Sequence, residues 1–162
     1  NMGSTIHGKT VGIIGYGKVG KYLHKLLRNF GAKIIINEKN KISQKKTSLK
    51  NLIKNSDIIS INTSLISKKK ILDKKNLKLC KKNCVIINTS RPEVLDYNYL
   101  YIMLKKNKIL GAGLDVFEKE PYFGKLSKLK NVFMTPHIGS YSKEIRLKME
   151  LEALNSIFKI NH

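Results

Sequence analysis

Hydrophobic and polar residues follow different spacings along the chain, and each spacing predicts a strand or a helix. Short runs of consecutive apolar residues bounded by Gly, Asn or Ser are typical of strands buried in a parallel sheet. Six such runs predict strands at 10–15, 33–37, 58–62, 84–88, 111–115 and 132–134. Apolar residues three or four positions apart predict helices that end at Phe30, begin after Ser48, and span 74–79, 97–106 and 142–160. This alternation predicts an α/β fold in a single domain, with a doubly wound parallel sheet covered by helices on both faces.

A glycine-rich turn follows the first predicted strand and opens the first helix. It reads Gly15-Tyr16-Gly17-Lys18-Val19-Gly20, the Gly-x-Gly-x-x-Gly fingerprint of dinucleotide binding. Gly15 permits the tight turn, Gly17 lets the backbone approach a pyrophosphate, and Gly20 lets the helix pack closely on the strand. Glu38 follows the second strand, 18 positions after Gly20, close to the spacing of the carboxylate that holds the adenosine ribose. Together these features predict a Rossmann fold that binds a dinucleotide.

Three polar residues that follow later strands carry the candidate chemistry. Arg91 comes after the fourth strand, Glu120 after the fifth and His137 after the sixth, at the edge where open parallel sheets bind ligands. A guanidinium can hold a carboxylate through two parallel hydrogen bonds, an imidazole can exchange a proton near neutral pH, and a neighbouring carboxylate orients the ring. That set suits hydride transfer to a keto acid. Each residue alone also fits a structural role: a surface ion pair, a solvated loop acid, and a loop histidine with satisfied hydrogen bonds.

The formal net charge of +21 over 162 residues raises the question of a nucleic-acid partner. Only three basic residues are arginines, however, and the lysines are spread along the whole chain without interleaved aromatic residues. Phosphate and base recognition usually recruits arginine and stacking aromatics, so no specific nucleic-acid partner is expected. The sequence shows no apolar run long enough to span a membrane and no secretory signal, so a cytoplasmic protein is expected. Cys80 and Cys84 have no His or Cys cluster near them, which predicts buried reduced thiols and no metal site.

The predicted helix at 142–160 carries more apolar surface than one packing face requires. Its apolar residues form two stripes that are offset around the helix. One stripe comprises Ile145, Met149, Ala153, Ile157 and Ile160, and the other comprises Leu147, Leu151, Leu154 and Phe158. A helix buried on all sides would account for both stripes, and so would a partner that covers the second stripe.

The strongest motifs of the chain resemble those of the D-isomer-specific 2-hydroxyacid dehydrogenases, the family of D-3-phosphoglycerate dehydrogenase and of glyoxylate and hydroxypyruvate reductases. These motifs are Gly-Lys-Thr-Val-Gly-Ile-Ile-Gly-Tyr-Gly at 8–17, Ile-Asn-Thr-Ser-Arg at 87–91, Leu-Asp-Val-Phe at 114–117 with Glu-Pro at 120–121, and Thr-Pro-His-Ile-Gly at 135–139. The resemblance runs over residues 7–160 and is to the NAD-binding domain of that family.

The resemblance implies roles for particular residues. Arg91 would bind the substrate, His137 would act as the acid/base and Glu120 would be its partner. NAD would be the cofactor, a small 2-hydroxy or 2-keto acid the substrate, and the domain would form a homodimer. The residues expected to contact NAD are Gly15, Gly17, Lys18, Val19, Gly20, Glu38, Thr89, Ser90, Arg91, Asp115, His137, Gly139 and Ser140.

The sequence also departs from the family. The family usually has glycine where this chain has Pro92, and proline removes an amide donor and pushes Arg91 toward extended geometry. The family's proline-containing stretch after the third strand has no counterpart at 62–65. Residues 1–5 are expected to be a cloning remnant or a disordered start, and 6–160 the dinucleotide-binding domain. The family's substrate domain, which would contain most of the residues that select the hydroxy acid, is missing from this chain.

Two functions therefore compete. The first is the NAD-binding domain of an NAD-dependent 2-hydroxyacid dehydrogenase, in which case this chain alone is expected to be an inactive fragment. The second is a non-catalytic NAD(H)-binding or sensing module that keeps the fold without turnover. Pro92 and the missing substrate domain favour the second slightly.

Overall fold

The structure, a computed structural model, describes residues 3–63 and 70–160. The described residues form a six-stranded parallel sheet in the order β2-β1-β3-β4-β5-β6. The strands are β1 (Thr10–Ile14), β2 (Lys33–Asn37), β3 (Ile58–Ile61), β4 (Val85–Asn88), β5 (Gly111–Leu114) and β6 (Val132–Met134). All six predicted strands are therefore confirmed, with ends that differ by no more than one residue.

The helices also match the predicted positions. They are α1 (Lys18–Asn29), α2 (Leu49–Asn55), α3 (Lys74–Leu77), α4 (Tyr97–Lys105) and α5 (Lys143–Ile160), with short 3-10 helices η1 (Pro92–Val94) and η2 (Lys125–Lys128). Ser48 caps α2 by accepting a hydrogen bond from the Asn51 amide, and Asp96 caps α4 in the same way through the Tyr99 amide. Such caps satisfy amides that have no acceptor within the helix, which fixes where each helix begins.

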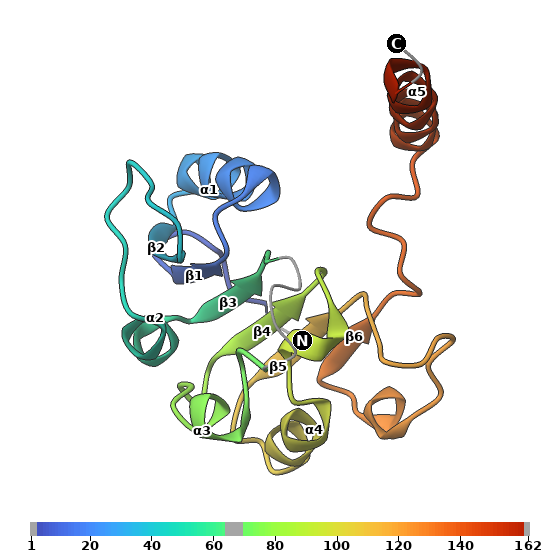
Figure 1. The fold of residues 1–162 in the computed structure, drawn as a ribbon. Coiled ribbons are helices and arrows are strands. Elements are labelled where there is room, and N and C mark those ends of the chain that lie inside the picture. The colour runs from blue at the N-terminus through green and yellow to red at the C-terminus, as the bar shows by residue number, and fades with distance from the viewer. Residues whose placement is uncertain (1–2, 64–69, 161–162) are drawn as a thin grey trace.

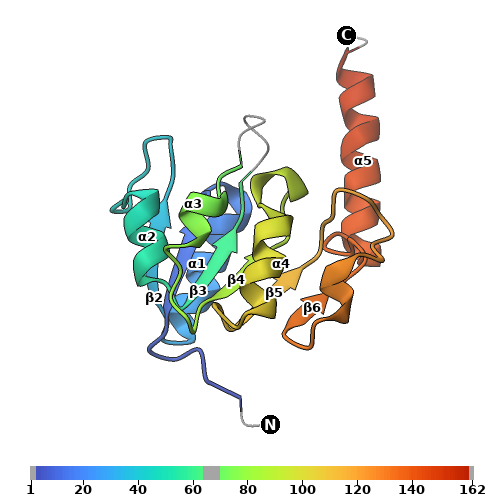
Figure 2. The same cartoon turned by 90° about the horizontal axis from the view of Figure 1, so that it is seen from below.

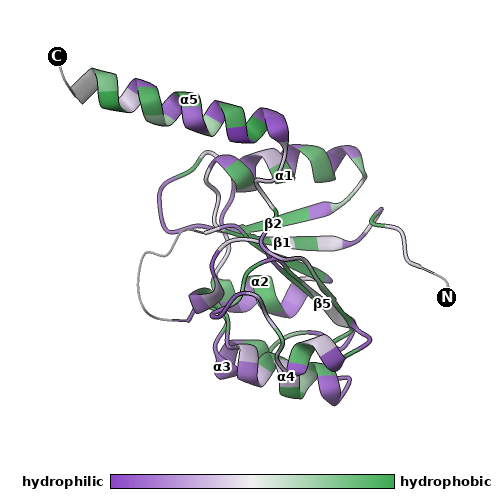
Figure 3. Ribbon diagram, turned by 90° about the vertical axis from the view of Figure 1, so that its right-hand side faces the viewer, coloured by the Kyte–Doolittle hydropathy of each residue, from purple (hydrophilic) through white to green (hydrophobic). Residues whose placement is uncertain are grey.

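The helices divide unequally between the two faces of the sheet. Helices α2, α3 and α4 lie on one face and α1 lies on the other (Figures 1 and 3). The division follows from the order of the strands. The chain passes from β1 to β2 in one direction and then returns past β1 to β3 in the other. Because both crossovers are right-handed, their helices lie on opposite faces of the sheet. The larger core cluster therefore lies under α2–α4, and a smaller one, with Val11, Ile13, Tyr16 and Ile36, lies under α1.

The prediction that helices cover both faces of the sheet is confirmed for the face under α2–α4. On the other face, α1 covers part of the sheet. On the α1 side, an apolar pocket of about 320 Å³ lies between α1 and the neighbouring strands, with Leu23, Leu26, Ile58 and Ile87 in its wall. Farther along the same face, the Phe133 side chain of β6 is 74% exposed. Among the described residues, α1 covers β1 and β2 on this face but leaves β6 open, because the later crossovers all place their helices on the opposite face.

Helix α5 projects away from the body of the domain (Figures 1 and 2). All of its side chains from 143 to 158 are exposed, including Ile145 (48%) and Phe158 (66%). The interpretation of this segment as a deeply buried helix is therefore wrong: two of the eighteen side chains lie outside the described set, and the other sixteen have no cover within the chain. The expectation that apolar residues of α5 need an external partner is consistent with this exposure.

Candidate active site

The glycine turn and the polar loops all leave the sheet at one edge. Parallel pairing aligns the strand ends, so that Ile61 lies beside Asn88, and Leu114 lies beside both Asn88 and Met134. The segments that follow these ends, at 15–20, 89–91, 115–121 and 135–140, therefore share the carboxyl edge. Strand order reverses between β1 and β3, which is the point where open α/β sheets form their ligand crevice.

The three glycines of the turn differ in what a side chain at each position would contact. At Gly15, φ is +89°, and a Cβ would come within 2.7 Å of the Asn62 carbonyl oxygen. At Gly20, a Cβ would collide with the Gly15 carbonyl oxygen, so only glycine lets α1 pack this closely. At Gly17, a Cβ would meet no atom within 4 Å, which leaves open space above the first turn of α1. The amides that begin α1 have no acceptor within the helix and no side-chain cap, so this open space suits a pyrophosphate.

Glu38 connects the end of β2 to this turn. Its Oε2 accepts a hydrogen bond from the Tyr16 amide at 2.7 Å, and its Oε1 accepts one from the Asn40 amide at 3.0 Å. Desolvation raises the pKa of Glu38, but the amide hydrogen bonds and the nearby Lys46 outweigh it, so the pKa lies below its ordinary value. A carboxylate oxygen has two lone pairs, so each oxygen can still accept a further hydrogen bond. The charged side chain therefore lies directly beside the glycine turn.

Buried Asn88, which the sequence analysis did not identify as a site residue, organises the turn that carries Arg91. Its Oδ1 accepts hydrogen bonds from the Ser90 amide (3.1 Å) and hydroxyl (3.0 Å), and its Nδ2 donates to the Arg91 carbonyl oxygen (3.0 Å). Nδ2 also donates to the Tyr97 hydroxyl, which donates to the Val116 carbonyl oxygen at 2.6 Å. An asparagine at the end of a buried strand is a signal of such a turn, because a buried amide must find several partners.

Arg91 is exposed and extends from this turn. Its Nη1 donates to the Ser90 carbonyl oxygen at 2.8 Å, and none of the ion pairs in the described part of the chain involves its guanidinium. The surface ion pair that would have explained Arg91 structurally is therefore not found there. Its backbone is extended (φ −140°, ψ 141°), as the following proline predicts, and Pro92 is the first residue of η1. Proline is well tolerated at this position, because that amide has no acceptor within the helix in any case.

Asp115 anchors the loop that carries His137. Its Oδ1 accepts hydrogen bonds from the Thr135 hydroxyl and the Ile138 amide (2.9 Å), and its Oδ2 accepts one from the Gly139 amide (3.0 Å). Desolvation raises the pKa of Asp115, but these three donors and His137 outweigh it, so the pKa lies below its ordinary value. The carboxylate therefore ties the end of β5 to the loop after β6.

His137 and Glu120 meet although they are 17 positions apart. The Nδ1 atom of His137 lies 3.0 Å from Oε2 of Glu120, as expected from the two loop motifs. Oε1 of Glu120 accepts a hydrogen bond from the Phe117 amide at 2.9 Å. The Phe117 amide, and after it His137, lower the pKa of Glu120 below its ordinary value. Because a carboxylate only accepts, Nδ1 donates in this pair, and Nε2 remains as the ring nitrogen for proton exchange.

The other residues expected to contact NAD also lie at this edge. Lys18, Val19 and Thr89 are exposed, and Ser140 is half-buried. The structure does not place Arg91 in contact with Glu120 or His137 through any hydrogen bond or ion pair among the described side chains. Residues 64 and 65 of the stretch that departs from the family lie outside the described residues. In the described part of the chain, no helix has the length and apolar character of a membrane span, and no group of three or more His, Cys, Asp or Glu residues could hold a metal ion.

Comparison with known proteins bears directly on this site. The family profile for the NAD-binding domain of D-isomer specific 2-hydroxyacid dehydrogenases matches residues 1–139. A glyoxylate reductase of Thermococcus litoralis is 43% identical over 166 residues, which cover 96% of this chain and 50% of that protein.

Two solved structures share the fold. The NAD-complexed form of a D-isomer specific 2-hydroxyacid dehydrogenase from Lactobacillus delbrueckii ssp. bulgaricus superposes with a TM-score of 0.85 at 29% identity, covering 98% of this chain and 56% of that chain. An acyclic imino acid reductase in complex with NADPH and D-Arg gives a TM-score of 0.90 at 34% identity, covering 98% of this chain and 53% of that one. The chain thus spans about half the length of the relatives it matches.

Proposed function

Because this chain belongs to the D-isomer specific 2-hydroxyacid dehydrogenases as an NAD-binding domain, we propose that the whole protein transfers a hydride between NAD(H) and a D-2-hydroxy acid/2-keto acid pair. The contact between His137 and Glu120 is the observation that carries the proposal. It supplies a proton donor, already oriented by a carboxylate, at the same sheet edge as the glycine turn.

Each polar residue of the site then has a task. When NADH is bound, it supplies the hydride that reduces the substrate carbonyl carbon. The Nε2 proton of His137 passes to the carbonyl oxygen, and in the reverse reaction the ring takes that proton back. Glu120 holds the ring in the tautomer that leaves Nε2 for this exchange and stabilises the imidazolium. The Arg91 guanidinium, which has no carboxylate partner among the described side chains, grips the substrate carboxylate.

The cofactor would lie along the carboxyl edge. The 15–20 turn would hold the pyrophosphate, Glu38 the adenosine ribose, and the 89–91 and 137–140 segments the nicotinamide half. Asp115 would act mainly by holding the 137–140 segment, since its carboxylate is buried and accepts three hydrogen bonds from the protein. Glu38 favours NAD over NADP, because it would repel a 2′-phosphate. Lys39 and Lys41 follow Glu38 in sequence and reduce this repulsion, and one relative of the chain is solved in complex with NADPH.

A non-catalytic NAD(H)-binding module is the alternative function, and Pro92 no longer favours it. Pro92 is the first residue of η1, a position that needs no amide donor, and the Arg91 side chain stays exposed. The apolar side chains of α5 support a homodimer in which this helix is covered. The free thiols of Cys80 and Cys84 suit the reducing cytoplasm, where we place the protein.

The test is NADH oxidation by the whole protein with glyoxylate and larger 2-keto acids, compared between the parent and Arg91→Lys. Lysine keeps the charge but loses the two parallel hydrogen bonds, so kcat/KM should fall by a factor on the order of 100 while NAD affinity and thermal stability stay unchanged. Unchanged kcat/KM would show that Arg91 does not hold the substrate. Binding of NADH with no turnover of any 2-keto acid would instead favour the non-catalytic module.

A further inference from the structure

One tyrosine joins the turn that carries Arg91 to the loop that carries Glu120. Tyr97 is the first residue of α4, directly after the cap residue Asp96. Helix α4 follows β4, so its first turn lies near the carboxyl edge of the sheet, and side chains tilt toward the start of their helix. The Tyr97 hydroxyl therefore reaches the segments that follow both β4 and β5.

On one side, Tyr97 contacts the turn after β4. Nδ2 of Asn88 donates one hydrogen bond to the Tyr97 hydroxyl (3.2 Å) and another to the Arg91 carbonyl oxygen (3.0 Å). The orientation of the Asn88 side-chain amide is fixed, because its Oδ1 accepts from the Ser90 amide, which can only donate. The Ser90 carbonyl oxygen in turn accepts a hydrogen bond from Nη1 of Arg91. A displacement of Asn88 would therefore move the backbone that supports the guanidinium.

On the other side, Tyr97 contacts a peptide group whose opposite end holds Glu120. The Tyr97 hydroxyl donates to the Val116 carbonyl oxygen at 2.6 Å. The Phe117 amide belongs to the same peptide group, and it donates to Oε1 of Glu120 at 2.9 Å. Because a trans peptide group is planar, with its C=O and N–H pointing in opposite directions, fixing the carbonyl oxygen also fixes the amide. Oε2 of Glu120 then lies 3.0 Å from Nδ1 of His137.

Burial stabilises this network. Asn88 and Val116 are buried, and Tyr97 is half-buried. Desolvation, above all, raises the pKa of the Tyr97 hydroxyl above its ordinary value, so the hydroxyl keeps its proton. Since Nδ2 of Asn88 can only donate to the hydroxyl, that proton is directed to the Val116 carbonyl oxygen. Connected hydrogen bonds polarise and strengthen one another where the dielectric constant is low.

We propose that Tyr97 is a positioning residue whose hydroxyl fixes the placement of His137 relative to Arg91. This role rests on the proposed function, in which Arg91 holds the substrate carboxylate and His137 exchanges a proton with the substrate carbonyl oxygen. Both groups act on one small molecule, so a displacement of one relative to the other changes how well the proton donor faces the carbonyl oxygen. Tyr97 acts through Asn88 and through the peptide group that holds Glu120.

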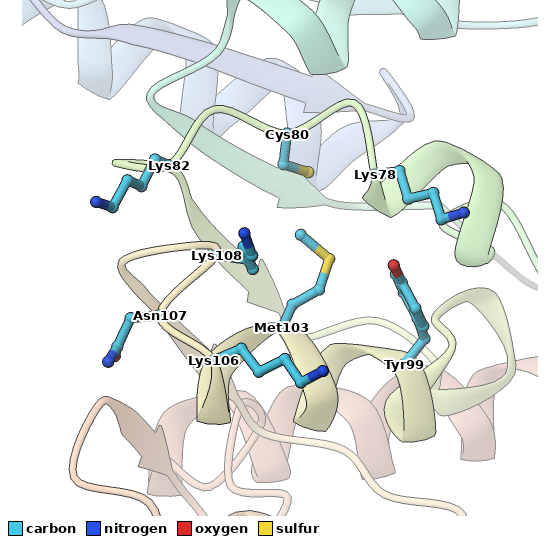
Figure 4. A pocket seen from close by; sticks show the side chains of 8 residues that line it. All are labelled: Lys78, Cys80, Lys82, Tyr99, Met103, Lys106, Asn107 and Lys108. Carbon is cyan, nitrogen blue, oxygen red and sulfur yellow. The ribbon is translucent and has the colours of Figure 1, made fainter.

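The test is Tyr97→Phe in the whole protein, with Tyr99→Phe as the matched control. Phenylalanine keeps the ring, whose centroid lies 5.9 Å from that of Phe117, and removes only the hydroxyl. Tyr99 is also half-buried, but it lines a pocket of about 570 Å³ together with Lys78 and Met103 (Figure 4). None of the network residues, all of which the structure describes, lines that pocket. The control therefore removes a tyrosine hydroxyl from the same helix at a distance from the network.

Two measurements separate positioning from a merely structural role. In the reduction of the 2-keto acid that the parent reduces fastest, kcat should fall about tenfold in Tyr97→Phe, with less than about a twofold change in KM. The reason is that Arg91 still binds the substrate while the proton donor is less well placed. Hydrogen exchange of the Phe117 amide, which does not depend on turnover, should become about tenfold faster. Both quantities should equal those of the parent in Tyr99→Phe.

A parent-like kcat in Tyr97→Phe would overturn the proposal, and so would parent-like exchange at Phe117, because the hydroxyl would then not hold the peptide group. A parent that reduces no 2-keto acid would instead refute the proposed function, and the role of Tyr97 with it. Asn88→Ser breaks the same network at its other end and should also lower kcat. A parent-like kcat in Asn88→Ser would refute the proposal even if Tyr97→Phe did not fold.

Discussion

The glycine turn and helix α5 differ in whether their contacts are made within the domain. Around the turn, the main contacts are made inside the domain: Leu23 and Leu27 of α1 pack against the cluster of Val11, Ile13, Tyr16 and Ile36, Gly20 lies against Gly15, and Glu38 binds the Tyr16 amide. Helix α5 is longer than α1, yet its described side chains are all exposed. The comparison teaches that an apolar pattern specifies a helix locally, whereas its burial depends on what else is present.

The largest expected effect comes from Gly15→Ala, which should destabilise the domain. The side chain would require a left-handed backbone and would overlap the backbone at Asn62 and Thr63, so we expect a loss on the order of 3 kcal/mol in the free energy of unfolding by denaturant titration. Gly17→Ala is the matched variant. Its added Cβ meets open space, so stability should change by less than about 0.5 kcal/mol while NAD affinity falls. Equal loss of stability in both variants would contradict these separate roles.

Acid should weaken the network that holds the 135–139 loop. The pKa of Asp115 is lower in the folded chain than in the unfolded one, so its stabilisation is complete above its ordinary pKa of about 3.9 and is lost as pH falls through the lower folded value. In Asp115→Asn, one of the three donors that now bind the carboxylate would face the side-chain NH₂ group, which cannot accept a hydrogen bond. The free energy of unfolding should therefore fall by about 2 kcal/mol at neutral pH, and it should depend less on pH in acid.

The matched control for Asp115 is Glu118→Gln. Glu118 is exposed and lies 3.8 Å from Lys70, so its replacement should leave the pH profile of the unfolding free energy nearly unchanged. An acid limb for Asp115→Asn that overlays the parent would show that Asp115 does not hold the loop through its charge.

Substitutions in helix α5 should change the association of two chains and leave the fold intact, in contrast to substitutions in the glycine turn. Leu151→Ser with Leu154→Ser removes two exposed apolar side chains, so the dimer dissociation constant from light scattering should rise about tenfold with no loss of thermal stability. Lys148→Ser on the same helix is the control and should leave dimerisation unchanged. A parent chain that stays monomeric at high concentration would refute this use of α5.

The smallest expected effect concerns coenzyme choice at Glu38. Calorimetry should show that the parent binds NAD more tightly than NADP, and Glu38→Gln should reduce that preference about tenfold by removing the charge that repels a 2′-phosphate. Glu144→Gln, far along the chain on α5, is the control for a general change in charge. Equal affinities of the parent for NAD and NADP would show that Glu38 does not select the coenzyme.

Local patterns were sufficient for most of the fold and for the pairing at the site. The six strands could be predicted because buried parallel strands are nearly continuous apolar runs, and His137 meets Glu120 because adjacent strand ends bring their loops together. The sequence left open whether α5 is buried or waits for a partner, and it did not predict the open half of the α1 face, since both depend on which elements cover which surface. Asn88 was missed because its position at the end of a buried strand signals a turn but does not show which groups its side chain binds.

Pro92 has a consequence for the energetics of the substrate binding proposed for Arg91. Its ring restricts the rotation of the Arg91 backbone before any ligand arrives, since a residue that precedes proline has few conformations other than the extended one that Arg91 adopts. Less conformational entropy then remains to be lost when the guanidinium closes on a carboxylate, and a preorganised group binds more tightly for the same contacts. A substitution that looks like damage to a family motif can thus lower the entropic cost of forming the complex.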